Sequence, residues 1–587
     1  MKKLIMLIGA ATVAVGAFAD ASTPPSTLVD LTTNGSNPSG SVDEYSSAIY
    51  SSSGYNATKA FDGVRVVEAD RNSRWLPKPT GDMWFIYAFN VPTVVDSIRI
   101  YLPIQVSNDL KQAARAPKKW TFQGSNDKST WVVLDTQTNE TSWAKGESRY
   151  YKFSNTTAYK YYKFNCTANN GNSDCMQVDE IEFYCVGTAA NSTWTGEGTT
   201  DLLSDVANWG GTSMPGSGGY TALIGNTGSK PAVVPGGLTV YYQFQVGNGS
   251  GNSAKVVQTN GTMRLLHTGT IGREGGVGEY SISGGEFVAT NTTTYIGART
   301  GKGTGVLDIS GTADVKFNDI RMFYNVSAGS TARINVSENG TLSFTSMDLG
   351  YSSVNATGIV YQTGGTVKTG GYLGIGYNSK VVGVYEMTGG TCAIGGEVTA
   401  GRFGKGTLAV SGPGTVLTAN TVRIGLTSGT NKGTGTLVVT NGGEVAATQF
   451  YAGAGASATN QATVTFNGGK LTAKAANDAF LKDFPNIQLE AGGLTIDTQG
   501  YALGISNCTF NVTGNGKITV VGGGTVTFAN VTVYMSEKPS GAYVFAETDG
   551  TFSGVPTLDG IKGVKIELSN DLKRVVVTSK GFIIAVF

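Results

Sequence analysis

Residues 24–187 contain short segments in which apolar and polar side chains alternate, and turn residues separate these segments. Alternation with a period of two is typical of strands that bury one face, and no helical periodicity accompanies it. The region therefore predicts a β-sandwich. The expected strands are Met83–Phe89, Ser97–Leu102, Trp120–Gly124, Trp131–Asp135, Arg149–Phe153, Tyr159–Asn165 and Glu180–Tyr184.

Residues 255–475 repeat with a period of about 25 residues, set by two recurring anchors. A paired turn forms the first anchor, as at Gly364-Gly365-Thr366, and an apolar residue followed by glycine forms the second, as at Ile375-Gly376. A short β repeat of this kind predicts a parallel β-helix, or β-solenoid, in which each strand pairs with its equivalent in the next coil. About eight coils are recognisable, and one of them, around Met322, is degenerate.

The flanking segments are expected to close the ends of this solenoid. Residues 188–254 predict a β-rich linker and N-terminal cap, and residues 476–587 predict terminal coils and a C-terminal cap. Ala475–Phe484 is expected to form a short helix. Caps are needed because an exposed parallel edge invites association with other chains.

The first residues predict export. Lys2 and Lys3 precede an apolar run from Leu4 to Val15, and small residues end the segment at Ala19. This is the pattern of a secretory signal peptide, residues 1–19, with cleavage near Ala19. No later apolar run is long enough to span a membrane, so we expect a secreted or cell-surface chain without a transmembrane segment after cleavage.

The composition restricts the classes of binding partner that we expect. The chain has a net charge of +1, and only 14% of its residues are charged, so nothing indicates binding to nucleic acid or to an anionic membrane. Five cysteines leave at least one unpaired. Cys166 and Cys175 either form a disulfide or remain buried thiols, whereas Cys392 and Cys508 are expected in the core of the repeats.

Motifs in the first domain resemble the discoidin fold, also called coagulation factor five/eight type C, and within it carbohydrate-binding module family 32. The resemblance implies a jelly-roll β-sandwich that binds glycan through loops at one end. The motifs are Lys59-Ala60-Phe61-Asp62-Gly63, Arg74-Trp75, Trp84, Pro117-Lys118, Trp120 to Asp127, Trp131, Tyr161-Tyr162-Lys163-Phe164 and Asp179 to Tyr184.

The same resemblance implies a structural Ca²⁺. The matching ligands are the Lys59 carbonyl, the Asp62 carboxylate and Glu180, all oxygen donors of the kind that Ca²⁺ prefers. The family expects a short polar ligand soon after the aspartate, and here Ser73 takes that place after the insertion Val64–Asn72. The alternative is that Asp62 only caps a turn.

Sugar binding needs an aromatic face and nearby polar groups. Loop residues of these types are the candidate carbohydrate ligands, and Trp143 is expected to be exposed beside Lys145-Gly146. Each of them has an alternative role in loop packing. The candidates are Trp143, Arg115, Tyr50, Tyr55 and Asn169.

The repeats resemble autotransporter passenger domains and the autotransporter-associated β-strand repeats of bacterial surface proteins, most closely at Gly516–Val531. Together the two resemblances imply a carbohydrate-binding adhesion protein, not an enzyme, that uses the solenoid as a rod-like scaffold and has a glycan or a cell-surface matrix as partner.

The alternative function is a β-helix polysaccharide lyase or glycoside hydrolase with an appended binding module. Such chemistry needs clustered acids, whereas the acids of the repeats lie on different coils and His267 is the only histidine. The acids are Asp308, Asp314, Asp319 and Asp348.

A third hypothesis is a polymer-binding stripe along the rod. It would comprise Arg273, Arg299, Arg402, Tyr351 and Tyr377.

Overall fold

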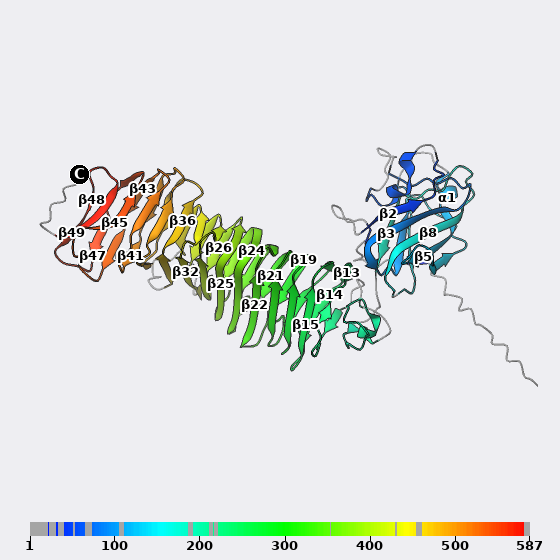
Figure 1. The fold of residues 1–587 in the computed structure, drawn as a ribbon, viewed down its shortest axis with the longest axis horizontal. Helices are drawn as coiled ribbons and strands as arrows, with labels where there is room; N and C mark the ends of the chain where they lie inside the picture. Colours follow the sequence, from blue (N-terminus) through cyan, green and yellow to red (C-terminus); the bar gives the residue numbers. More distant parts are fainter. Residues whose placement is uncertain are drawn as a thin grey trace, which may run out of the picture. The chain divides into compact units, whose positions relative to one another are not determined.

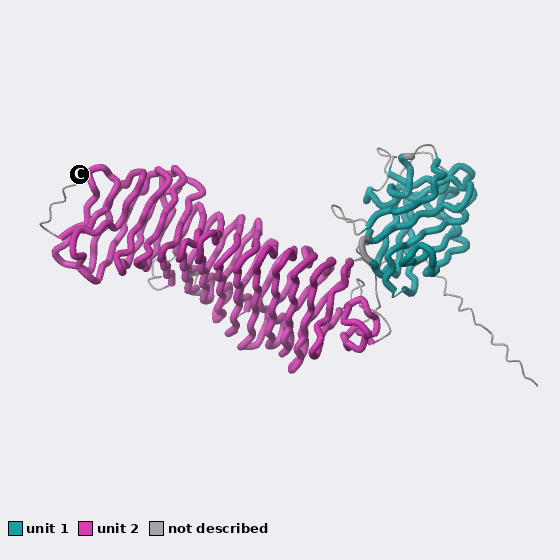
Figure 2. The backbone as a smooth tube through the Cα atoms, viewed as in Figure 1, with its two compact units in different colours: residues 1–187 teal, residues 188–587 magenta. Residues whose placement is uncertain are grey.

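The computed structural model describes residues 21–22, 31–32, 40–50, 53–64, 73–104, 111–155, 157–185, 192–210, 215, 221–352, 354–428, 431–453 and 461–579. The expected signal peptide lies outside the described residues. The chain divides into two compact units, Met1–Gly187 and Thr188–Phe587 (Figure 2). No helix in the described ranges has the length and hydropathy needed to cross a bilayer.

The first unit is a β-sandwich of two antiparallel sheets (Figure 1). The five-stranded sheet has the order β2 (Gly40–Tyr45), β3 (Met83–Thr93), β8 (Tyr159–Asn169), β5 (Pro117–Ser125) and β6 (Val132–Gln137). The four-stranded sheet has the order β1 (Ala21–Ser22), β7 (Ser148–Lys152), β4 (Ser97–Tyr101) and β9 (Glu180–Tyr184). Short helical turns lie in the loops: η1 (Ser53–Tyr55), η2 (Ala57–Ala60) and α1 (Gln112–Arg115).

Aromatic side chains fill the sandwich. Alternate residues of β3 point inward, and Phe85 stacks on Phe164 with ring centroids 5.7 Å apart. Phe183 of the opposite sheet meets Phe122 edge to face at 5.0 Å. Trp120 is buried against Phe164 at 5.2 Å. Period-two alternation thus produces a core of packed rings, whose edge-to-face and stacked contacts are favourable.

The second unit is a β-solenoid of about 13 turns, each of roughly 25 residues (Figure 1). Each turn contributes one strand to each of three parallel sheets, here named faces 1, 2 and 3. The strands β14 (Gln243–Asn248), β15 (Ser253–Gln258) and β16 (Thr262–Leu265) of one turn pair with β17, β18 and β19 of the next. Pairing with an equivalent strand explains why the sequence repeats.

Face 1 contains β10 (Ser192–Thr193), β11 (Thr221–Ile224), β14, β17 (Gly269–Arg273), β26 (Glu397–Ala400), β29 (Thr421–Ile424), β34 (Gln449–Ala452), β37 (Asn477–Lys482), β40 (Leu503–Ser506), β43 (Thr525–Ala529) and β46 (Thr551–Ser553). Face 2 contains β12 (Ala232–Val233), β15, β18 (Val277–Ile282), β20 (Thr304–Ile309), β22 (Ser330–Val336), β27 (Lys405–Ser411), β32 (Thr434–Thr440), β35 (Ala462–Asn467), β38 (Ile487–Leu489), β41 (Thr509–Val512), β44 (Thr532–Met535) and β47 (Thr557–Asp559).

Face 3 contains β13 (Leu238–Tyr241), β16, β28 (Val416–Thr418), β33 (Glu444–Ala447), β36 (Gly469–Ala473), β39 (Leu494–Asp497), β42 (Ile518–Val521) and β45 (Tyr543–Thr548). Long strands turn a corner and serve two or three faces: β19 (Glu286–Ile296), β21 (Asp314–Met322), β23 (Thr341–Leu349), β24 (Ala356–Ile375) and β25 (Val381–Ile394). A small hairpin joins β30 (Thr427–Ser428) to β31 (Asn431–Lys432).

The solenoid core is a set of stacked columns. One column on face 2 places a buried apolar or tyrosine side chain at the same register position in twelve successive turns, so each of these turns covers the apolar surface of its neighbours. Its members are Val256, Tyr280, Leu307, Ile334, Val360, Tyr385, Leu408, Leu437, Val464, Ile487, Phe510 and Val533.

Corners between faces 1 and 2 explain the second anchor. Gly376 has a φ of +69°, and a Cβ atom there would collide with the Lys405 carbonyl of the next turn. The degenerate repeat is a complete turn, because Phe323 occupies this corner with a φ of +77° in place of glycine. A bulky residue in the left-handed region is rare, which explains why the sequence pattern fades here.

Both ends of the solenoid are covered. Trp194 meets Trp209 edge to face at 5.3 Å, and Trp209 donates its indole N–H to the Leu203 carbonyl, within a segment that holds η3 (Val206–Trp209). At the other end β49 (Arg574–Ser579) pairs antiparallel with β45 and with β48 (Val564–Leu568). Antiparallel pairing ends the parallel stack.

The structure settles two expectations from the sequence. The expected helix at Ala475–Phe484 is wrong, since Asn477–Lys482 is strand β37, paired with β34 and β40. Cys166 is a buried free thiol, so the Cys166–Cys175 disulfide is not formed. Burial raises the pKa of the Cys166 thiol to about 12, which keeps it protonated and unreactive.

Candidate functional site

Backbone hydrogen bonds tie several loops together at one end of the sandwich. The Tyr50 amide donates to the Leu76 carbonyl at 2.9 Å, and the Leu76 amide donates to the Tyr55 carbonyl at 3.0 Å. In the neighbouring loops, the Gln177 amide donates to the Arg115 carbonyl at 2.9 Å. Three of the candidate ligand residues, Tyr50, Tyr55 and Arg115, therefore belong to one connected group of loops.

Tyr55 is half-buried, and the guanidinium of Arg74 lies 5.6 Å from its ring centroid. A guanidinium over an aromatic face is attracted by the ring quadrupole, which fixes the orientation of both side chains. Arg74 was not among the candidate ligand residues, although it stands in the Arg74-Trp75 motif. The sequence signal that could have identified Arg74 is its place directly before Trp75 in a family motif.

Arg115 has a side chain that is 12% exposed at the end of α1. Its Nη2 lies 3.9 Å from the Asp174 carboxylate, and its Nη1 lies 3.5 Å from Oε1 of Gln177. The carboxylate of Asp174 also lies 3.4 Å from the Lys111 ammonium. Two cations therefore share the Asp174 carboxylate.

The side chain of Asn169 stabilises the loop in which it lies through hydrogen bonds to the backbone. Its side-chain amide donates to the carbonyls of Asn172 and Cys175, at 2.8 and 3.1 Å, and its oxygen accepts from the Gly171 amide at 3.0 Å. Both N–H bonds of the amide are therefore used within the loop. The structure supports the loop-packing role that was the alternative for this residue.

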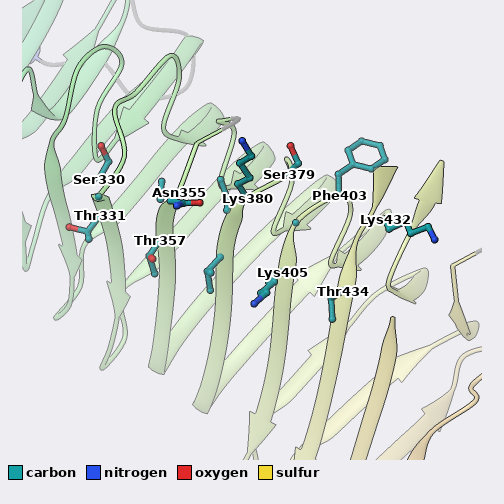
Figure 3. Close-up of a pocket in the computed structure, with 15 residues that line it drawn as sticks. Ser330, Thr331, Asn355, Thr357, Ser379, Lys380, Phe403, Lys405, Lys432 and Thr434 are labelled. Carbon is teal, nitrogen blue, oxygen red and sulfur yellow. The ribbon is translucent and has the colours of Figure 1, made fainter. Parts of the chain in front are cut away.

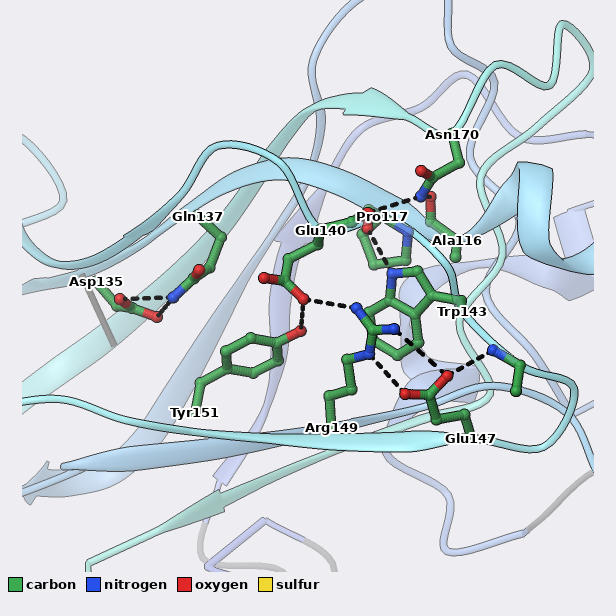
Figure 4. Close-up of polar contacts among 11 residues, drawn as sticks. Ala116, Pro117, Asp135, Gln137, Glu140, Trp143, Glu147, Arg149, Tyr151 and Asn170 are labelled. Carbon is green, nitrogen blue, oxygen red and sulfur yellow. Dashed lines mark hydrogen bonds and ion pairs between the residues drawn. The ribbon is translucent and has the colours of Figure 1, made fainter. Parts of the chain in front are cut away.

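Trp143 is 4% exposed, so the expectation of an exposed tryptophan is wrong. Its indole N–H donates to the Pro117 carbonyl at 3.2 Å, and the Arg149 guanidinium covers the ring at 4.1 Å (Figure 4). Arg149 in turn pairs with Glu140 at 2.8 Å and with Glu147 at 2.7 Å. Polar residues near Trp143 in the sequence suggested an exposed tryptophan. In the structure these residues, Arg149 with Glu140 and Glu147, cover the ring instead.

The predicted calcium ligands meet around Gly63. Asp62 Oδ1 accepts from the Val64 amide at 3.1 Å, Asp62 Oδ2 accepts from the Ser73 hydroxyl, and Glu180 Oε1 accepts from the Gly63 amide at 3.4 Å. Lys59 places its ammonium 3.3 Å from Asp62 Oδ2. The structure thus brings Asp62, Ser73 and Glu180 together.

The donor chemistry of this group fits Ca²⁺, because two carboxylates and a hydroxyl supply hard oxygen atoms. In the described part of the chain, no three histidine, cysteine, aspartate or glutamate side chains form a group that could hold a metal ion. Any ion here therefore depends on Ser73 and on backbone oxygens beside Asp62 and Glu180. The Lys59 ammonium would have to leave Asp62 when an ion binds, because like charges repel.

A second group of chemical interest lies at the corner between faces 1 and 2 of the solenoid, just after strands β21, β23 and β24. Tyr324, Tyr351 and Tyr377 of successive turns stack with ring centroids 6.0 and 5.1 Å apart. The Arg402 guanidinium lies 4.4 Å from the Tyr377 ring, and the Arg321 guanidinium lies 4.4 Å from the Tyr351 ring. The other two arginines of the predicted stripe do not contact these three rings. Arg299 lies 5.6 Å from the Tyr295 ring, and Arg273 pairs with Glu274 at 2.9 Å.

Asp348 is buried beneath this row. It accepts a hydrogen bond from the Tyr372 hydroxyl at 3.3 Å, and its Oδ1 has no hydrogen-bond partner among the described residues. Burial raises the pKa of the Asp348 carboxyl to about 7, although Tyr372, Arg321 and Arg402 act to lower it. Asp319 on the preceding turn adds to the increase, so these acids interact across turns although they are distant in sequence.

The other solenoid acids are held in ordinary surface contacts. Asp314 pairs with Lys316 at 2.8 Å, Asp319 accepts from the Ser346 hydroxyl at 2.6 Å, and Asp308 accepts from Asn335 and Ser281.

The model of the F5/8 type C domain family matches residues 42–181. That segment is an F5/8 type C, or discoidin, domain, as its motifs predicted, and its structural neighbours include family 32 carbohydrate-binding modules. The β-solenoid expected to follow it is also confirmed. No curated protein matches the chain in a sequence search.

Three solved structures illustrate the neighbours of the first unit. Chitosan-binding module 1 of a chitosanase/glucanase from Paenibacillus sp. IK-5 shares 21% identity, with 27% of this chain and 99% of that chain covered and a TM-score of 0.20. The family 32 module of EndoD from Streptococcus pneumoniae shares 9% identity over 27% and 99%, with a TM-score of 0.22. A fucose binding module from Streptococcus pneumoniae shares 13% identity over 27% and 98%, with a TM-score of 0.20.

Proposed function

We propose that this chain is an exported glycan-binding adhesion protein without enzymatic activity. In this proposal the discoidin unit binds a glycan at the bacterial surface or in the surrounding matrix, and the solenoid is a scaffold. The observation that carries the proposal is the F5/8 type C domain at residues 42–181, whose connected loops bring aromatic and cationic side chains together.

Tyr50, Tyr55 and Arg115 are the residues assigned to the glycan. The tyrosine rings provide apolar surface for the C–H bonds of a pyranose, and the Arg115 guanidinium provides N–H donors for its oxygens. Arg74 acts on Tyr55, whose ring it holds at 5.6 Å. Trp143 has no role at the surface and supports the loops from below through Pro117.

The proposal includes a structural Ca²⁺ held by Asp62, Ser73 and Glu180, with the Lys59 carbonyl as a further ligand. A bound ion would supply positive charge between these carboxylates and tie the η2 region to β9. Its role is structural, since Lys59 lies in η2, Asp62 follows it, and Glu180 opens the last strand of the sandwich.

A glycan array with the full chain tests the binding proposal. We expect selective binding that the paired substitution Tyr55→Ala and Arg115→Ala reduces at least about tenfold, since loss of about 1.4 kcal/mol of binding free energy has this effect. Tyr534→Ala is the matched control, because Tyr534 is 42% exposed on the solenoid. Absence of binding to every glycan, with and without Ca²⁺, would overturn the proposal.

Polysaccharide cleavage is the second candidate function, and Asp348 is the specific observation that favours it. A carboxyl group with a pKa of about 7 beside a tyrosine hydroxyl is suited to donating or accepting a proton near neutral pH. Incubation of the full chain with acidic and neutral polysaccharides distinguishes the two functions. New reducing ends or unsaturated products that vanish in Asp348→Asn would replace the adhesion proposal with an enzymatic one.

A further inference from the structure

A groove runs along the corner between faces 1 and 2 of the solenoid (Figure 3). Its volume is about 580 Å³, and its wall crosses successive turns through the register positions Thr331, Thr357, Val382, Lys405 and Thr434. Successive turns are about 4.8 Å apart, which is close to the length of one pyranose unit in an extended chain. The groove is therefore shaped for a linear polymer that lies along the solenoid axis.

Among the described residues that line this groove, three are lysines and none is acidic. Lys380, Lys405 and Lys432 belong to three successive turns, and all three are solvent-exposed. Figure 3 shows their side chains distributed along the wall, one on each turn. Three positive charges without an acid in the lining make the groove electrostatically complementary to an anion.

Several lysines elsewhere on the solenoid pair with acids. Lys255 contacts Glu279 on the next turn, Lys316 lies 3.0 Å from Glu286, and Lys517 lies 2.6 Å from Glu547. In the described ranges, Lys380, Lys405 and Lys432 have no carboxylate within ion-pair distance. Several turns thus pair lysine with acid, but Lys302 and Lys368 also lack an ion pair among the described residues. The groove differs because three such lysines line one surface.

Phe403 supplies an apolar surface at the same place. Its ring stands on the corner loop between Ser379 and Lys432 (Figure 3). The Arg402 guanidinium lies 5.7 Å from the Phe403 ring and 4.4 Å from the Tyr377 ring, so it contacts both the groove and the stacked tyrosines at this corner. An aromatic ring beside several cations meets both requirements of an acidic sugar, a C–H surface and a charged substituent.

We propose that this groove is a second glycan site, separate from the discoidin unit, and that it binds a linear acidic polysaccharide. Lys380, Lys405 and Lys432 pair with carboxylate or sulfate groups on successive sugar units, and Phe403 packs against the pyranose face. The solenoid then has a binding role of its own along with its role as a scaffold. Because the site lies in the second unit, it does not depend on the function proposed for the first.

Binding of the full chain to immobilised polygalacturonate, with dextran sulfate and uncharged dextran in parallel, tests this proposal. We expect binding to at least one anionic polymer and none to dextran, with an affinity that decreases as salt screens the charges. The triple variant Lys380→Ser, Lys405→Ser and Lys432→Ser should lose at least about tenfold in affinity. Polygalacturonate and dextran sulfate together show whether carboxylate or sulfate is the preferred group.

The matched control removes the same charge elsewhere on the solenoid, through Lys255→Ser, Lys517→Ser and Lys565→Ser. It should bind as the unmodified chain does, and so should the discoidin variant Tyr55→Ala and Arg115→Ala. A conservative variant, Lys405→Arg, should retain binding, which separates charge from folding. Equal losses in the groove and control triples, or no binding to either anionic polymer, would overturn the second site.

Discussion

The hydroxyl of Tyr385 donates a hydrogen bond of 2.9 Å to Oε1 of Gln362 inside the solenoid core. Gln362 is fully buried, and its amide donates to the Thr391 carbonyl at 2.9 Å. The same arrangement occurs four coils earlier, where Tyr280 donates to Gln258 at 2.6 Å. Each pair satisfies polar groups that would otherwise be costly to bury, and each links face 2 to a corner.

Tyr385→Phe should lower the free energy of unfolding of the solenoid by about 1–3 kcal/mol, because it leaves Gln362 Oε1 buried without its donor. Chemical unfolding followed by circular dichroism measures the change. Tyr361→Phe is the control, since Tyr361 is 36% exposed on the outer surface and should change stability little. Equal effects of the two substitutions would argue against a role for the buried pair.

Trp143→Ala should destabilise the discoidin unit by about 3–5 kcal/mol, as expected for removal of a buried tryptophan. Differential scanning calorimetry detects this as a lower transition temperature. Trp143→Phe should be milder, because it keeps much of the packing under Arg149 and loses only the hydrogen bond to Pro117. A Trp143→Ala protein with unchanged stability and weakened glycan binding would restore the surface role that the sequence suggested.

Asp348 should make the solenoid less stable as pH rises. Burial raises the pKa of its carboxyl from 3.8 to about 7, so between these values the folded chain holds a proton that the unfolded chain releases. Stability is therefore greatest below pH 4 for this group and is lost up to pH 7, by at most about 4 kcal/mol. Asp348→Asn should flatten the dependence measured by urea unfolding between pH 4 and 8, whereas Asp314→Asn should leave it unchanged.

Gly376→Ala should destabilise the solenoid by about 1–3 kcal/mol, the scale of strain expected for a side chain forced into the left-handed region. The new Cβ would also meet the Lys405 carbonyl. Gly370→Ala is the matched control, because a Cβ there has no atom within 4 Å and the backbone does not require glycine. Thermal unfolding of the two variants should therefore differ clearly, and equal transition temperatures would contradict the corner argument.

Removal of Ca²⁺ should lower the transition temperature of the discoidin unit if Asp62, Ser73 and Glu180 hold an ion. Calorimetry with EDTA and with added Ca²⁺ measures the shift, which follows from preferential binding to the folded state. Asp62→Asn should abolish the response, and Asp174→Asn, in a different loop, should preserve it. An unmodified chain whose transition does not respond to Ca²⁺ would assign Asp62 to the turn alone.

Strand positions and the repeat were predictable because they follow from local periodicity. The motifs around Trp120 and Asp179 indicated the discoidin domain, and the glycine anchors indicated the solenoid. The turn around Phe323 was recognisable only as a degenerate repeat, and the strand at Asn477–Lys482 was missed. Both have one physical reason: pairing with neighbouring turns imposed a β conformation on sequence with weak local signals.

By itself, the sequence determined an all-β chain with a sandwich followed by a parallel solenoid, and it identified Asp62, Ser73 and Glu180 as neighbours. Tertiary structure decided which side chains reach solvent: Trp143 is covered by Arg149, while Phe403 and three unmatched lysines line a groove. It also brought Asp319 and Asp348 onto adjacent turns. Exposure and charge pairing depend on stacking between segments about 25 residues apart, and local pattern does not specify them.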